Sequence, residues 1–379
     1  MESFFCKKMP RHALLRHYPV CKATLIVLYC SVQMFLTAPG VQKMDWSKKN
    51  IYGKVGSMRQ LASVRRAVLD DGKSRNMRIV DVNNGSGLSF TVYPDRGMDI
   101  GECSFCGIPL VWLTPETGGP EFYESEKFNW LRSWGGGLLT GCGLLNVGGP
   151  GEYDGENHGL HGRVSHLPGR DVNTDSRWEN DRFLLEVSGK VHHSKVFGEN
   201  LLLTRKISTA LGDNSITIED SVENLGYAPS PFMQLYHMNF SYPLVDENSY
   251  LTATEHQIVP KDDHSASGIS QWDKITSPVP GFAEQLFYHY LPADENGMAK
   301  IKLVNPDLKI ALQIAYRSAE LPLLAQWKQL GQGEYVIGLE PANCLPEGRQ
   351  ANIDKGMLKT IAPGEIVNHK IIISVEKLS

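Results

Sequence analysis

Histidines and one glutamate are the residues of this sequence best suited to chemistry. His158 and His161 lie three positions apart in a segment that contains glycine, and His237 lies in a run of aromatic and polar residues. Glu340 follows the apolar run 335–339 and precedes a proline. An imidazole titrates near neutral pH, and burial raises the pKa of a carboxyl group toward the same range. These groups therefore suit proton transfer between an acid and a base.

The same histidines allow a metal-binding interpretation. His158 and His161 have a spacing that metal ligands can use, but Gly159 between them indicates a loop, and no acidic third ligand lies nearby. Cys103 and Cys106 have C-x-x-C spacing without a second such pair, and in a strand they would point to opposite faces. We therefore predict no metal.

Glycine-rich segments argue against a nucleotide cofactor and a serine nucleophile. Residues 134–143 and 148–151 contain neither the dinucleotide-binding pattern nor the phosphate-binding loop pattern. The sequence also contains no G-x-S-x-G element of the serine hydrolases. We therefore predict neither a nucleotide-binding site nor a serine hydrolase.

Charge and composition restrict the partners. The chain has 379 residues, with 38 Lys and Arg against 42 Asp and Glu, and 41% of its residues are hydrophobic. A net charge of -4 without a basic cluster provides no surface for a nucleic acid. The composition is typical of a globular domain and suits a small-molecule ligand. It does not predict an oligomeric state.

The leader, residues 1–43, differs in composition from the rest. It contains six basic residues and one acidic residue, and residues 23–42 are uncharged. The leader is interpretable as a secretory signal, as a marginal membrane anchor, or as an over-extended start before Met44. A start at Met44 predicts a cytoplasmic protein, and a genuine signal predicts a periplasmic or secreted one.

Residues 44–379 must position the ionisable groups, and their pattern predicts many strands. Residues 77–82 and 88–93 are β-rich runs around a turn segment, and Leu88, Phe90 and Val92 alternate onto one face. The same pattern recurs over residues 183–192, 201–211, 215–222, 301–303, 309–315, 335–339 and 366–375.

These strands follow one another without intervening amphipathic helices. That order favours antiparallel sheets over a parallel, doubly wound fold. The sequence therefore predicts a single all-β, antiparallel β-sandwich domain with few short helices. Only residues 57–70 have helical spacing of apolar residues.

Three segments resemble a known family when they are taken together. Residues 157–162 read N-H-G-L-H-G, residues 236–243 read Y-H-M-N-F-S-Y-P, and residues 338–344 read G-L-E-P-A-N-C. In this order they resemble the signature segments of galactose mutarotase-like proteins, the aldose 1-epimerases. Residues 93–100, Y-P-D-R-G-M-D-I, with residues 107–112 behind them, resemble the DUF4432 branch more closely. The resemblance spans most of residues 60–379 and implies a β-supersandwich fold.

The resemblance also implies roles for particular residues. Glu340 would be the general base at the anomeric hydroxyl, and His237 would protonate the ring oxygen. His161, with Asn157 beside it, would hold the ring oxygen or neighbouring hydroxyl groups. Arg96 would match an arginine that contacts the sugar, although its D-R-G context differs from that of well-known mutarotases. The sugar ring would open, rotate and close again, with the two proton roles exchanged.

Further residues could contact the sugar. Arg163 follows H-G where a second glycine is usual, so it could bind a carboxylate, sulfonate or phosphate, or pair with Glu152 or Asp154. Trp134 could form an aromatic platform with Trp130 and Trp327, or these indoles could pack in the core. The remaining predicted substrate-binding residues are His158, Asn239 and Gln326.

The predicted function is therefore an aldose 1-epimerase-like isomerase acting on a small sugar, with acidic sugars among the candidates through Arg163. Two alternatives stay open: a non-catalytic carbohydrate-binding protein, and a lyase or isomerase of a modified sugar on the same scaffold. The epimerase interpretation requires Glu340 and His237 to converge on a pocket wide enough for one pyranose.

Overall fold

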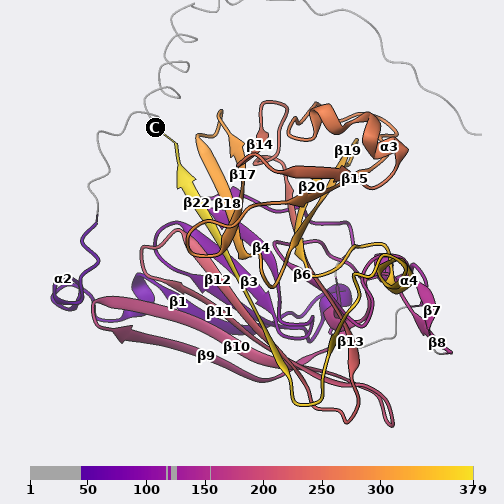
Figure 1. Cartoon of the computed structure of the whole chain (residues 1–379). Helices are drawn as coiled ribbons and strands as arrows, with labels where there is room; N and C mark the ends of the chain where they lie inside the picture. The colour runs from indigo at the N-terminus through magenta and orange to yellow at the C-terminus, as the bar shows by residue number, and fades with distance from the viewer. Residues whose placement is uncertain (1–43, 117, 121–125, 154, 379) are drawn as a thin grey trace, which may run out of the picture. The chain divides into compact units, whose positions relative to one another are not determined.

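The described part of the chain is built almost entirely from antiparallel strands (Figure 1). The computed structural model describes residues 44–116, 118–120, 126–153 and 155–378. Residues from Trp46 onward group into one compact unit. The leader lies outside the described residues. Within the ranges that are described, no helix has the length and apolar character needed to cross a membrane.

The strands of the described residues form three large sheets and one hairpin. The five-stranded sheet contains, in order, β1 (Ser63–Val68), β2 (Arg78–Asn83), β3 (Leu88–Tyr93), β4 (Asp99–Phe105) and β5 (Ile108–Pro109). The eight-stranded sheet contains β14 (Tyr250–Ala253), β17 (Met298–Asn305), β18 (Ile310–Arg317), β22 (Ile366–Lys377), β12 (Ser215–Asn224), β11 (Asn200–Ala210), β10 (Arg182–Ser194) and β9 (Gly169–Glu179). The seven-stranded sheet contains β15 (Gln257–Pro260), β16 (Gln285–Tyr290), β19 (Leu323–Gly331), β20 (Glu334–Ala342), β13 (Ser230–Ser241) and β21 (Lys359–Ile361), with β6 (Thr140–Leu144) also paired to β13. The hairpin contains β7 (Gly151–Tyr153) and β8 (Glu156–His158).

Alternation of apolar and polar residues explains the long strands of the eight-stranded sheet. In β10, β11 and β12, buried side chains alternate with partly exposed ones along the whole strand. One face of each strand therefore contacts the core and the other contacts solvent. The sequence predictions over residues 183–192, 201–211 and 215–222 are confirmed, as is the hairpin of β2 and β3.

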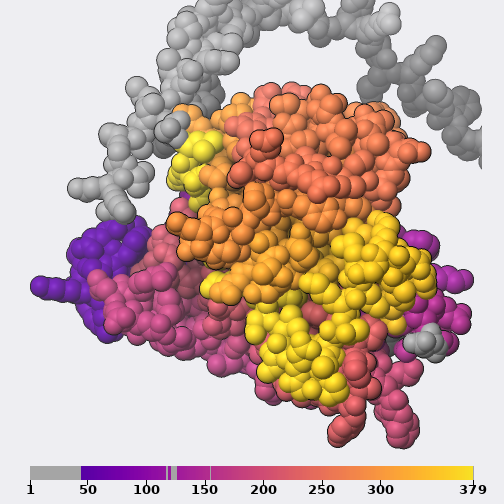
Figure 2. Space-filling model, viewed as in Figure 1, coloured from indigo at the N-terminus to yellow at the C-terminus, as the bar shows by residue number. Residues whose placement is uncertain are grey.

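A common hydrophobic core joins the sheets. It contains residues of β10, β11, β12 and β22 from the larger sheet and of β13 and β20 from the seven-stranded sheet. β13 is buried along nearly its whole length, so both of its faces are covered by protein. In Figure 2, residues of the C-terminal third, coloured orange to yellow, cover much of the visible face. The fold is thus the antiparallel β-sandwich that the sequence predicts.

Helices are few and short among the described residues. They are α2 (Lys48–Tyr52), α3 (Asp263–Ser267) and α4 (Arg349–Asp354), with 3-10 turns η1 (Met58–Gln60), η2 (Gly72–Ser74), η3 (Asn129–Arg132), η4 (Val164–His166) and η5 (Ile269–Gln271). The helix expected over residues 57–70 is wrong. Only η1 is helical there, because Ser63–Val68 forms β1 and pairs with β2. Strand pairing overrides the helical spacing of that segment.

A buried ion cluster ties the sheets together. The Arg205 guanidinium on β11 is fully buried and donates two hydrogen bonds to Asp220 on β12, at 2.9 and 2.8 Å. Its Nη1 donates to Asp99 Oδ1 on β4 at 2.9 Å. Asp220 also accepts the hydroxyl of Tyr236 on β13 at 2.8 Å. One cation therefore compensates two buried carboxylates and connects strands of all three large sheets.

Replacement of this cation should destabilise the fold strongly. Arg205→Leu leaves Asp99 and Asp220 buried without their counter-charge, which costs about 3–5 kcal/mol. We expect a large fall in the urea midpoint, measured by near-UV circular dichroism. Lys206→Leu on the same strand is the control, because the ion pair of Lys206 with Glu219 is partly exposed and contributes about 1 kcal/mol or less.

Arg205→Lys separates this effect from a simple failure to fold. Lysine keeps the charge but cannot reproduce the two-pronged bond to Asp220, so an intermediate midpoint is expected. Equal midpoints for Arg205→Leu and Lys206→Leu would contradict the role given to the cluster.

Candidate active site

His237 and Glu340 are brought together by the pairing of β13 with β20. The register places Met238 opposite Leu339 and Asn239 opposite Gly338, so His237 faces Glu340 across the two strands. Nε2 of His237 lies 3.3 Å from Oε1 of Glu340. Two residues about a hundred positions apart in sequence therefore meet, as the sequence predicts.

Both side chains lie on the face of the seven-stranded sheet that points away from the common core. Gly338 lies two residues before Glu340 on β20, and its lack of a side chain leaves room for the Glu340 carboxyl group. A Cβ atom on Gly338 would lie only 2.5 Å from Oε1 of Glu340. The glycine of the G-L-E motif is thus explained by the space that the glutamate occupies.

Aromatic side chains cover this face. The ring of Trp134 packs against those of His237 and Trp130, with centroid distances of 5.0 and 4.7 Å. Trp327 lies 5.5 Å from His237 between ring centroids, and His161 lies at the same distance. The predicted aromatic group is therefore present beside the pair. We call these four rings around His237 the aromatic wall.

Burial sets the protonation of the site. It raises the pKa of Glu340 well above its usual value, with a smaller contribution from Glu284. Burial also lowers the pKa of His237 well below its usual value, and nearby His161 adds to this effect. The pKa of His161 falls to about 4 for the same reason. Both shifts favour the uncharged forms, a carboxylic acid and a neutral imidazole, whereas the resemblance implies a carboxylate base.

Three buried polar atoms of this face have no hydrogen-bond partner among the described residues. They are Nδ1 of His237, Oδ1 of Asn239 and Oε1 of Glu340. The amide nitrogen of Asn239 is used, because it donates to the carbonyl oxygens of Gly137 and His237, both at 3.0 Å. Each buried polar atom left unpaired costs about 1–3 kcal/mol. Such a cluster is typical of a site that binds a polar ligand.

The pocket expected between Glu340 and His237 is not observed. Their separation of 3.3 Å leaves no space for a pyranose ring. Five cavities formed by described residues contain neither Glu340 nor His237 nor His161 in their linings. The reason is the aromatic wall, whose indoles occupy the space over the pair.

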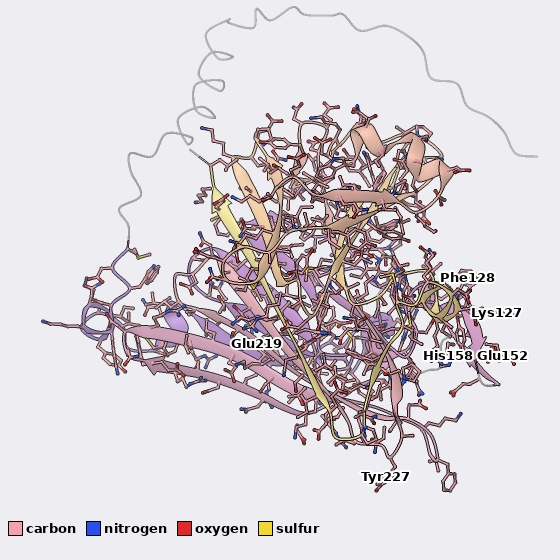
Figure 3. All side chains as sticks on the ribbon, viewed as in Figure 1. Lys127, Phe128, Glu152, His158, Glu219 and Tyr227 are labelled. Carbon is pink, nitrogen blue, oxygen red and sulfur yellow. The ribbon has the colours of Figure 1, made fainter. Side chains whose placement is uncertain are left out.

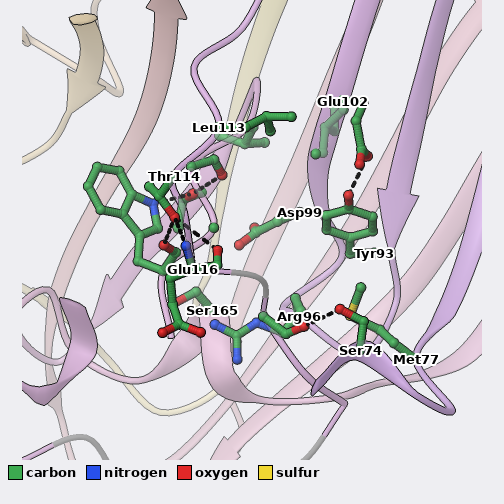
Figure 4. A pocket seen from close by; sticks show the side chains of 18 of the residues that line it. Ser74, Met77, Tyr93, Arg96, Asp99, Glu102, Leu113, Thr114, Glu116 and Ser165 are labelled. Atoms are coloured by element: carbon green, nitrogen blue, oxygen red, sulfur yellow. Dashed lines mark hydrogen bonds between the residues drawn. The ribbon is translucent and has the colours of Figure 1, made fainter. Parts of the chain in front are cut away.

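Trp134, which packs against His237, also lines a cavity that Figure 4 shows from close by. It has a volume of about 250 Å³, and its lining includes Arg96, Asp99, Glu116, Thr140 and Trp134. We call it the Arg96 cavity. The predicted residue Arg96 therefore lies near the pair but does not line the same space as His237.

Sequence reasoning missed two carboxylates of the Arg96 cavity, Asp99 and Glu116. Asp99 lies three residues after Arg96 in the segment Y-P-D-R-G-M-D-I, so that segment contained the signal. Burial raises the pKa of Asp99 to about 6, although Arg205 opposes the shift. Glu116 pairs with Lys73 and has no motif around it that would have indicated a site.

The predicted residues Asn157, His158 and Arg163 lie elsewhere. They line a small cavity of about 30 Å³ together with His193 and Glu199. Figure 3 shows His158 at one edge of this view beside Glu152. These three residues therefore surround a different space from that of the His237–Glu340 pair, and their role in substrate binding stays a prediction.

The backbone at His161 explains this separation. His161 and Gly162 have positive φ angles of 57° and 71°, which reverse the chain between His158 and Arg163. His161 consequently contacts Trp130, with 4.9 Å between ring centroids. Arg163 instead lies 3.7 Å from Glu199, between its Nη1 and the carboxylate Oε1.

Two further expectations about individual residues are corrected. Arg163 pairs with Glu199 rather than with Glu152, and Asp154 lies outside the described residues. Gln326 faces the opposite side of the sheet, because its neighbour Ala325 is the residue that pairs with Glu340 on β20. The Gln326 side chain is bonded to His289 and to the carbonyl of Trp272.

Within the described ranges, no group of three or more His, Cys, Asp and Glu side chains is arranged to hold a metal ion. His158 and His161 contact different residues, His158 lying 3.2 Å from Arg349 between Nε2 and Nη2.

Comparisons with known proteins agree with this architecture. A family model described as a domain of unknown function, DUF4432, matches residues 74–375. A crystal structure from Klebsiella pneumoniae subsp. pneumoniae MGH 78578, provisionally described as an aldose 1-epimerase, is 22% identical with a TM-score of 0.76, and the match covers 84% of this chain and 86% of that chain. Searches of curated proteins give no match.

Two further solved structures share the fold at lower identity. A galactose mutarotase-like protein from Clostridium acetobutylicum is 14% identical with a TM-score of 0.59, over 84% of this chain and 100% of that chain. A galactose 1-epimerase from Lactobacillus acidophilus NCFM is 14% identical with a TM-score of 0.56, over the same shares. These likenesses show the galactose mutarotase-like fold.

Replacement of Glu340 should change the pH dependence of stability. In the unfolded chain a glutamate ionises above about pH 4.3, whereas in the fold the pKa of Glu340 is raised. Between these two values the folded state binds more protons, so the wild type loses stability as the pH rises. Glu340→Gln avoids this loss, and its advantage should grow by up to about 1.4 kcal/mol per pH unit in urea titrations.

Glu219→Gln is the control for this measurement. A hydrogen bond from Lys206 lowers the pKa of Glu219, which is partly exposed on the other sheet. Its replacement should therefore reduce stability slightly as the pH rises. Parallel stability curves for wild type and Glu340→Gln would contradict the protonation given to the site.

Proposed function

The chain belongs to the DUF4432 family, and we propose that it is a cofactor-free sugar isomerase of the aldose 1-epimerase type. The observation that supports this proposal is the contact between His237 and Glu340, an imidazole and a carboxyl group 3.3 Å apart. The partnerless polar atoms beside them support a polar ligand. The mutarotase-like fold of the solved neighbours agrees with it.

Anomer interconversion needs one acid and one base. The base takes the proton of the anomeric hydroxyl while the acid protonates the ring oxygen, so the C1–O5 bond breaks and a C1=O1 double bond forms. Closure on the other face reverses both transfers. Glu340 and His237, one as the acid and the other as the base, supply the two groups that this reaction requires.

The proton can start on either member of the pair. The resemblance assigns the base role to Glu340 and the acid role to His237. Burial favours the opposite arrangement in the ligand-free site, with the proton on Glu340. Because ring opening and closure exchange the two roles, both arrangements support turnover.

The sugar has to enter between the two groups for this chemistry. His237 and Glu340 are in contact, and the indoles of the aromatic wall cover them. Turnover therefore requires the wall to shift and the pair to separate. His161, which is partly exposed at the edge of the wall, is placed to contact a hydroxyl group of the entering sugar.

A non-catalytic carbohydrate-binding protein is the second candidate. It is favoured by the absence of the pair from the linings of the cavities mapped over the described residues. A metal-assisted lyase or isomerase using His158 and His161 together receives no such support, because these side chains contact different residues.

Anomer exchange measured by NMR distinguishes the first two candidates. We expect the wild type to accelerate exchange of at least one aldose, and Glu340→Gln and His237→Gln each to lower the rate by about 10²–10⁴-fold, the usual effect of losing a positioned acid or base. Glu219→Gln, on the other sheet, should keep the wild-type rate. Wild-type rates of anomer exchange in both site variants would contradict the epimerase proposal. Sugar binding without any acceleration of anomer exchange by the wild type would identify a binding protein.

A further inference from the structure

The Arg96 cavity has the size of a single-ring ligand site. Its volume of about 250 Å³ lies just below the range of about 300–1,000 Å³ that is usual for pockets of drug-sized ligands. A monosaccharide suits this volume better than a longer saccharide. Trp134 and Thr140 form the side of the cavity that is nearest to the acid–base pair.

The cavity is pre-formed by buried charged groups. Arg96 and Asp99 are only 8% and 5% exposed, yet both line the cavity. Nη2 of Arg96 donates to the carbonyl of Ser133 at 2.9 Å, and Asp99 accepts the amide of Gly141 at 2.9 Å. These bonds hold the guanidinium and the carboxyl group in place before any ligand arrives, which lowers the entropic cost of binding.

The rest of the lining suits a polyhydroxylated ring. The cavity lining contains four residues with hydroxyl groups: Ser74, Thr114, Thr140 and Ser165. Trp134 supplies an indole, an apolar surface suited to the face of a sugar ring. Figure 4 shows Arg96, Asp99 and Glu116 around the same space. Hydrogen-bond donors and acceptors thus surround the apolar surface of Trp134, as in small-molecule sites.

Trp134 separates this cavity from the acid–base pair. Its indole Nε1 donates to Thr140 Oγ1 at 3.0 Å, and Thr140 pairs with His237 between β6 and β13. The other side of the indole packs against His237. One side chain therefore lies between a sugar-sized space and the proposed chemistry.

Charge distinguishes between classes of sugar. Among the described residues, three carboxyl groups line the cavity, those of Asp99, Glu102 and Glu116, together with one guanidinium, that of Arg96. Lys73 pairs with Glu116, and Arg205 with Asp99, so the surroundings do not become positive. Arg163, the residue expected to bind an acidic substituent, is paired with Glu199 in another cavity.

From these observations we infer that the Arg96 cavity is the subsite that holds the substrate, that it selects neutral sugars over anionic ones, and that Trp134 is the wall between it and His237. This inference rests on the proposed function for the identity of the ligand as a sugar. It replaces the acidic substrate that the sequence suggested through Arg163.

Saturation-transfer NMR with matched sugars tests the inference. D-galactose and D-galacturonate differ only at C6, and the D-glucose and D-glucuronate pair provides a second comparison. Binding is measured in both the wild type and Glu340→Gln, so the result does not depend on turnover. We expect at least one neutral sugar to bind with a dissociation constant of at most about tens of millimolar. Its acidic counterpart should bind at least about tenfold more weakly, because the carboxylates that line the cavity repel it.

Variants locate the site. Arg96→Gln should weaken binding of the neutral sugar at least about tenfold, whereas Arg163→Gln should leave it unchanged. Glu116→Gln should reduce the discrimination against the acidic sugar. Glu219→Gln, a similarly exposed glutamate paired with a lysine on β12, should not; Figure 3 labels Glu219 on its strand.

The outcomes separate this inference from the proposed function. Equal or tighter binding of the acidic sugars, no binding of any of the four, or an unchanged affinity in Arg96→Gln would overturn the inference. Discriminating binding without anomer exchange in the wild type would leave the inference standing and reject the epimerase.

Discussion

Compensation of buried charge is the constraint on which the site depends. Arg205 lies fully inside the protein and is shared by two carboxylates, one on the five-stranded sheet and one on the eight-stranded sheet. Through Asp220 it fixes Tyr236, the residue before His237 on β13. Through Asp99 it fixes the floor of the Arg96 cavity. A single cation in the core therefore sets the positions of both the acid–base pair and the neighbouring cavity.

Burial has a different effect on ionisable groups that lack a partner of opposite charge. Around Arg205 the guanidinium donates hydrogen bonds of 2.8–2.9 Å to both carboxylates, so each buried acid has a partner of opposite charge. At Glu340 and His237 burial is the largest influence on both pKa values and favours the uncharged forms. A neutral pair suits a buried site, because it exchanges a proton internally without leaving an isolated charge in an apolar environment. The chemistry proposed for the site thus follows from its burial.

Sequence reasoning predicted more of the fold than of the site, for physical reasons. Apolar residues at every second position predicted most of the long strands, because one face of each strand is buried. The helix predicted over residues 57–70 was wrong, because the pairing of β1 with β2 depends on a strand further along the chain and not on local spacing. The convergence of Glu340 and His237 was predicted from motifs and follows from register. The direction of a loop is not encoded in spacing, so the reversal at His161 was missed. The segment around Arg96 indicates Asp99 as a candidate, but only the fold shows that Asp99 lines a cavity.

The closed site is a balance of terms of similar size. An indole such as that of Trp134 buries about 150–250 Å² of surface, which stabilises the closed arrangement by about 4–6 kcal/mol. Against this, three buried polar atoms without partners cost about 3–9 kcal/mol together. The two contributions are of similar size, so the opening that the proposed turnover requires would cost only about a few kcal/mol, and a ligand could supply this energy through a higher affinity for the opened arrangement. A ring with several hydroxyl groups can bond all three atoms at once, whereas an apolar ligand would leave them unpaired. The polar atoms of His237, Asn239 and Glu340 thus make opening of the wall dependent on the chemistry of the ligand.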